Sequence, residues 1–145
     1  MNHRKIAGIA ASTLGAVLAL AAFAPRGAGP TVTPPAVHEV RMVTVAGATR
    51  FEPAALTIRA GDRVRFVNVS GGPHNVSFDP ARVPADVRPV LAAAMPNQLQ
   101  PLWGPLMTGA NEGYTISFAG VKPGRYEFFC MPHMAMGMKG TVTVQ

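Results

Sequence analysis

The sequence has a single cysteine, Cys130, and only four histidines among its 145 residues. One cysteine excludes a disulfide scaffold and a zinc ribbon, because both need several cysteines. Charged residues are scarce as well, at 14% of the chain, and no basic run is longer than Arg4-Lys5. The formal net charge of +6 would suit a nucleic-acid partner, but Lys and Arg are scattered and form no basic helix. We therefore expect no nucleic-acid binding.

Apolar residues, glycine and proline are abundant instead. Hydrophobic residues make up 48% of the chain, with 15 glycines and 14 prolines. This content excludes an intrinsically disordered protein, which combines low hydrophobicity with high charge. The length fits one domain that buries a hydrophobic core.

The first 24 residues differ from the rest. The basic start, residues 1–5, precedes an uncharged apolar run from Ile6 to Ala24. This order is typical of a secretory signal peptide, with a cleavage site at Ala22-Phe23-Ala24, although Pro25 is a poor residue just after a cut. An uncleaved membrane anchor is the alternative, because the run of 19 residues approaches the ~20 that span a bilayer. Both interpretations predict a periplasmic or otherwise extracytoplasmic protein, with membrane contact only through a retained segment.

Residues 25–37 hold four prolines and two glycines and are interpreted as a linker, which leaves residues 38–145 as the domain. Short alternating segments separated by Gly/Pro turns predict an all-β, antiparallel Greek-key sandwich of seven to eight strands. Only residues 79–112 depart from this pattern. A short helix is possible at 86–95, weakened by Pro89. The expected strands are residues 39–45, 55–58, 63–69, 74–78, 114–118, 125–130 and 141–144.

Metal-binding side chains gather in residues 130–138, between the last two expected strands. Cys130, His133 and Met138 place a thiol, an imidazole and a thioether within nine residues, in the pattern C-x2-H-x4-M. Two histidines, one cysteine and a weak axial methionine form the blue-copper site. His74, after Gly71-Gly72-Pro73, is the candidate for the second histidine.

Each of these residues has an ordinary interpretation when taken alone. A lone buried cysteine is usually a small hydrophobe, and a lone histidine is usually hydrogen-bonded. The joint occurrence of Cys130, His133, Met138 and His74 in an exported chain predicts one copper ion per chain. His3 and His38 are expected to have no role at the site.

With these motifs the sequence resembles the small blue copper proteins, the cupredoxins of the plastocyanin and pseudoazurin type. The similarity runs from about Val40 to Val144 and is carried by residues 72–76, by residues 124–130 leading into the copper loop, and by the closing strand. The connection at 79–112 looks longer than in compact members. Its Trp103 and Met107 have no counterpart that can be assigned.

The resemblance gives two candidates for the axial ligand. Met138 completes the plastocyanin-like loop, whereas Met136 gives the shorter C-x2-H-x2-M loop of amicyanin-like members. In both subgroups the axial methionine precedes x-Gly and the last strand, as Met138-Lys139-Gly140 does, so Met138 is favoured. Asn75 is predicted to tie the His74 segment to the copper loop, and an ordinary asparagine beside a turn is the alternative.

The resemblance also implies how electrons would leave. His133 would be the exit, and Met131 and Met134 would leave an apolar rim around it for a transient redox partner protein, because such encounters are small and weak. We expect a monomeric, exported type 1 copper protein that shuttles single electrons by cycling between Cu(I) and Cu(II).

Histidine and cysteine counts separate this function from others. A multicopper oxidase needs many more histidines, and a binuclear CuA site needs two bridging cysteines, so we expect no enzyme activity. A periplasmic carrier or store that binds Cu(I) through Cys, His and Met is the main alternative, motivated by Met131, Met134 and Met136. A non-redox sandwich with a simply buried Cys130 is the third.

Overall fold

The structure is a computed structural model that describes residues 33–145. The predicted signal or anchor segment, and residues 25–32 of the predicted linker, lie outside this range. Among residues 33–145, no helix has the length and apolarity needed to cross a bilayer. The strands are β1 (Val37–Val45), β2 (Ala48–Glu52), β3 (Ala55–Ile58), β4 (Arg63–Asn68), β5 (Ser77–Phe78), β6 (Glu112–Ser117), β7 (Gly124–Phe129) and β8 (Lys139–Val144). The helices are α1 (Arg88–Ala93) and the 3-10 helix η1 (Met131–Met136).

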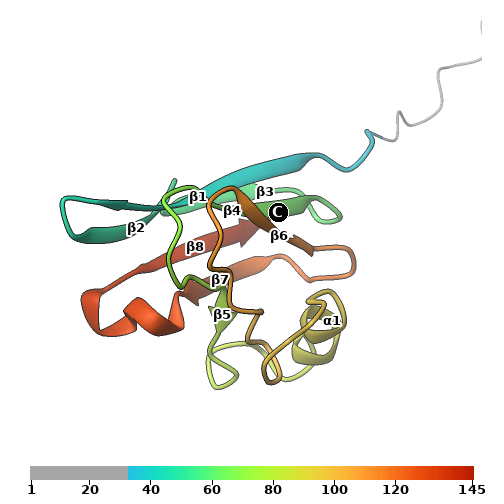
Figure 1. Ribbon diagram of the computed structural model, residues 1–145. Helices are drawn as coiled ribbons and strands as arrows, with labels where there is room; N and C mark the ends of the chain where they lie inside the picture. The colour runs from blue at the N-terminus through green and yellow to red at the C-terminus, as the bar shows by residue number, and fades with distance from the viewer. Residues whose placement is uncertain (1–32) are drawn as a thin grey trace, which may run out of the picture. The chain divides into compact units, whose positions relative to one another are not determined.

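The strands form two four-stranded sheets, in the orders β2-β1-β4-β6 and β3-β8-β7-β5 (Figure 1). The predicted all-β sandwich is confirmed. The prediction of purely antiparallel pairing needs correction, because β1 pairs with β4, and β3 with β8, in parallel. Alternation of polar and apolar residues reports which face a side chain occupies and carries no information about the direction of the neighbouring strand.

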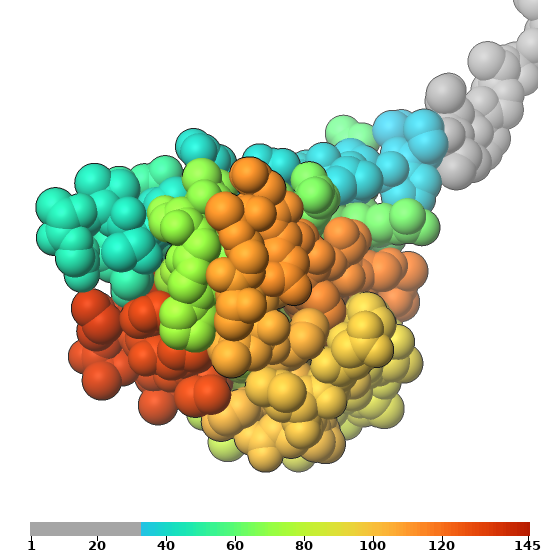
Figure 2. Space-filling model, viewed as in Figure 1, coloured from blue at the N-terminus to red at the C-terminus, as the bar shows by residue number. Residues whose placement is uncertain are grey.

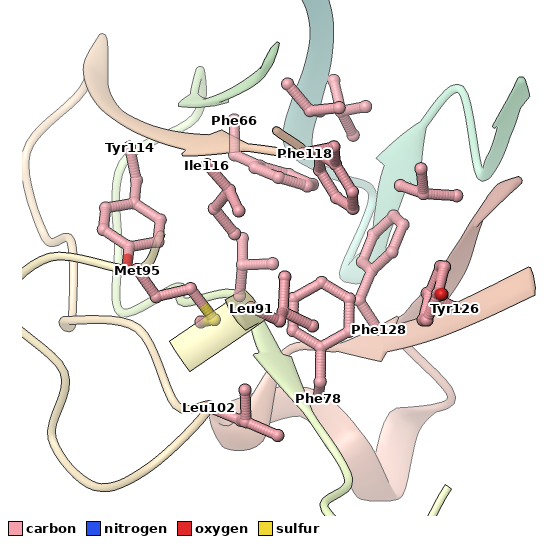
Figure 3. Packing of buried hydrophobic residues seen from close by; sticks show 14 of the residues in the cluster. Phe66, Phe78, Leu91, Met95, Leu102, Tyr114, Ile116, Phe118, Tyr126 and Phe128 are labelled. Carbon is pink, nitrogen blue, oxygen red and sulfur yellow. The ribbon is translucent and has the colours of Figure 1, made fainter. Parts of the chain in front are cut away.

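Aromatic rings join the two sheets. In β4, Val64 and Phe66 are buried while the alternate arginines are exposed, as a period of two requires. Phe66 and Phe51 of one sheet meet Phe128 of the other edge to face, at centroid distances of 5.2 and 4.8 Å. Figure 3 shows Phe66, Phe78 and Phe128 converging in this core. The core holds the two sheets, and therefore the loops at their ends, in fixed relation.

The connection of residues 79–112 packs against this core. The predicted short helix is present as α1, and proline in its first turn is compatible with helix geometry because an N–H there has no partner in any helix. Leu91, Met95 and Leu102 are buried from this segment (Figure 3). The chain then returns beside residues 74–78, where isolated bridges join His74 to Met107 and Ser77 to Trp103. Of the strand expected at 74–78, only Ser77–Phe78 pair with β7.

A buried carboxylate holds the start of β1. Asp62 accepts hydrogen bonds from the backbone N–H groups of Ala36 and Arg59, at 2.8 and 3.0 Å, and lies 2.8 Å from Nε2 of His38. The contact with His38, followed by these backbone bonds, lowers the pKa of Asp62 from 3.8 to about 2. His38 therefore has a structural partner away from the predicted metal-binding residues.

Candidate metal centre

The loop after β7 brings its three predicted ligands together through its own backbone. Cys130 follows the last residue of β7, His133 lies within η1, and Met138 precedes β8. The Cys130 N–H donates to the Met138 carbonyl at 3.0 Å, and the Met138 N–H donates to the His133 carbonyl at 3.2 Å. Gly137 ends η1 with a φ of 78°, a left-handed conformation that glycine adopts without a steric penalty. The loop is thus closed on itself.

His74 approaches this loop from the segment between β4 and β5. Its backbone makes two reciprocal bonds with Met107: the His74 N–H donates to the Met107 carbonyl at 2.9 Å, and the Met107 N–H donates to the His74 carbonyl at 2.8 Å. The connection of residues 79–112 therefore fixes this histidine. The sequence carries no signal that Met107 would do so, because the contact uses backbone atoms only.

The donor atoms of His74, Cys130 and His133 form a compact cluster. Sγ of Cys130 lies 3.6 Å from Nδ1 of His74 and 3.4 Å from Nδ1 of His133, and all three ligand atoms lie within 4.8 Å of one another. His74 and Cys130 are buried, whereas His133 is half-buried. The cluster therefore has two enclosed donors and one that reaches the protein surface.

The methionines of the loop differ sharply in burial. Met138 is 1% exposed, whereas Met131, Met134 and Met136 are 37%, 59% and 58% exposed. Met138 is therefore the only one of these four methionines that is buried, as His74 and Cys130 are.

Asn75 links the two segments of the site. Its Oδ1 accepts a hydrogen bond from the Met131 N–H at 2.8 Å, and its Nδ2 donates to Ser77 Oγ at 3.0 Å and to the Gly104 carbonyl at 3.3 Å. The side chain is fully buried, so these bonds are made without competition from water. They join the His74 segment, the loop of residues 130–138 and the connection of residues 79–112.

Burial also sets the protonation of the donors. It raises the pKa of the Cys130 thiol, opposed by hydrogen bonds from the backbone N–H groups of Asn75 and His133. Burial, and secondly the neighbouring His133, lower the pKa of His74, so this imidazole is held neutral with a free lone pair. Metal binding at this cluster would release the thiol proton to solvent.

The chemistry of the donor set fits copper. A thiolate and imidazoles with a buried thioether are soft and borderline ligands, which copper prefers, and no carboxylate belongs to the cluster, as calcium or magnesium would require. With Cys130 the only cysteine of the chain, no second thiolate is available for a binuclear centre.

Comparison with known proteins agrees with this chemistry. Residues 38–145 match the family described as copper binding proteins, plastocyanin/azurin family. Plastocyanin from Nostoc punctiforme is 39% identical over 109 residues, which cover 74% of this chain and 73% of that protein. The structure of oxidized plastocyanin from Dryopteris crassirhizoma matches with a TM-score of 0.60 at 32% identity, over 74% of this chain and 99% of the other. Pseudoazurin from Methylobacterium extorquens matches with a TM-score of 0.53 at 25% identity, over 74% of each chain.

Proposed function

Because the chain belongs to the plastocyanin/azurin family of copper-binding proteins, we propose that it is a type 1 copper electron carrier whose metal is held by His74, Cys130, His133 and Met138. The observation that carries this proposal is the cluster of three donor atoms within 4.8 Å, beside a buried methionine. Copper bound there supplies a one-electron couple between Cu(I) and Cu(II).

The protein would hold the copper ligands in fixed positions. His74 is fixed by its paired backbone bonds to Met107, and the Cys130 loop is fixed by its internal bonds and by Asn75. Ligands held this way keep nearly one arrangement in both oxidation states. Little of the protein then has to reorganise when an electron moves.

The half-buried His133 is the proposed point of electron exchange. It lies on the same loop as the exposed thioethers of Met131, Met134 and Met136, which offer an apolar contact surface to a transient redox partner. The basic start and apolar run of residues 1–24 support export, so we place this monomeric carrier outside the cytoplasm.

The three exposed thioethers also favour a second candidate, a carrier or store of Cu(I). A redox titration of the copper-loaded protein separates the two. Electron transfer predicts a reversible one-electron transition in which the same copper is oxidised and reduced without loss. A protein that keeps copper only as Cu(I), and releases it on oxidation, would instead be a carrier or store.

A further inference from the structure

An open cleft leads to the two histidines of the cluster. Its volume is about 570 Å³, and it lies where the hairpin of β1 and β2, residues 70–73 and η1 meet. Figure 2 shows these teal, green and red segments adjoining on one face. His74, at 1% exposed, forms the inner wall of the cleft, and His133 and Met136 line it as well. The remaining lining residues are threonines, a serine, glycines and a proline, so no charged carboxylate, ammonium or guanidinium is among them.

Met134 and Met136 form a natural pair for comparison. They lie two positions apart in η1 and are 59% and 58% exposed. Met136 faces the cleft that contains both imidazoles, whereas Met134 lines a different cavity, of about 440 Å³, together with Met138, Arg82 and Lys139. That second cavity contains neither imidazole, and its two cations are balanced by the carboxylates of Asp79 and Glu127, of which Glu127 pairs with Arg82.

We propose that Met136 is a transient Cu(I) ligand through which copper enters the site from this cleft. A neutral thioether binds soft Cu(I) but holds it weakly, which suits a ligand that must pass the ion onward. His133 lines the same cleft, and its ring centroid is 4.7 Å from that of His74, so successive donors lead inward. The passage is an exchange of ligands with no change in oxidation state, and the thiol proton of Cys130 leaves to solvent when the ion arrives.

The inference rests on the proposed copper site and makes a kinetic statement about it. Stopped-flow mixing of the copper-free protein with Cu(I), supplied as its bicinchoninate complex, measures uptake as loss of the colour of that complex. Met136→Leu should slow uptake about tenfold, equivalent to roughly 1.4 kcal/mol in the barrier. Met134→Leu, the matched control, should take up Cu(I) at the wild-type rate. Equal rates for wild type and Met136→Leu, or equal slowing in both variants, would overturn the entry route.

The end point of the same reaction tests the site separately. Oxidation of each loaded sample with ferricyanide should give the same blue absorption in wild type and both variants. If wild type gives no blue absorption, the proposed electron-transfer function fails whatever the rates are. If Met136→Leu alone has an altered spectrum, Met136 is a ligand of the finished site, and the entry proposal falls.

Discussion

Replacing Asn75 with alanine should weaken the fold and the hold on copper together. The fully buried side chain makes three hydrogen bonds, and its removal leaves the Met131 N–H and the Ser77 hydroxyl without those partners. A buried polar group without a partner costs about 1–3 kcal/mol, so we expect the free energy of unfolding of the copper-free protein to fall by about 3 kcal/mol. That is a large share of the roughly 5–15 kcal/mol that stabilises a domain.

Urea unfolding of the copper-free protein measures this loss, and Gln98→Ala is a matched control. The Gln98 amide also makes two hydrogen bonds, to the Ala92 carbonyl at 2.7 Å and from the Leu102 N–H at 2.6 Å, but these stay within the connection of residues 79–112. Both variants should be destabilised. Only Asn75→Ala should also release copper faster to a Cu(I) chelator, by at least about tenfold. Wild-type stability in Asn75→Ala, or equal release rates in the two variants, would refute this role.

Three further perturbations follow from the structure. Because folding lowers the pKa of Asp62 from 3.8 to about 2, its ionised carboxylate stabilises the fold above pH 3.8, and this stabilisation is lost as the pH falls toward 2. In Asp62→Asn, the free energy of unfolding measured with urea should therefore change less with pH over this acid range. The same pH dependence as in the wild type would contradict this role of Asp62. Gly140→Ala would put a Cβ 2.7 Å from the Ala54 carbonyl oxygen, so thermal unfolding should show a loss of about 1–3 kcal/mol, against less than about 0.5 kcal/mol for the roomier Gly109→Ala. Met138→Leu should keep copper but shift the reduction potential, and an unshifted potential would remove Met138 from the ligand set.

Local patterns in the sequence were sufficient to predict most of the strands. Alternation marks β4, with Val64 and Phe66 inward, because one face of each sheet is buried. The strand β2 was missed, since only Phe51 among its five residues is fully buried and one residue makes no period. The parallel pairings were missed for a different reason. They join strands that are far apart in the chain, and alternation of polar and apolar residues does not identify the neighbouring strand.

The site could be anticipated because its chemistry is concentrated in a short motif. Cys130, His133 and Met138 lie within nine residues, and His74, directly after Gly71-Gly72-Pro73, was the candidate for the second histidine. The supports of the site were less visible. Met107 and Gly104 act through backbone atoms, which any residue type provides, so only the folded connection of residues 79–112 reveals them.

The visible spectrum of the protein during titration with Cu(II) tests the central claim most directly. We predict an intense blue absorption that saturates at one copper per chain and is absent from Cys130→Ser, with circular dichroism showing that this variant remains folded. A folded wild-type protein without the blue band would contradict a type 1 copper centre at this site. So would a band that survives in Cys130→Ser.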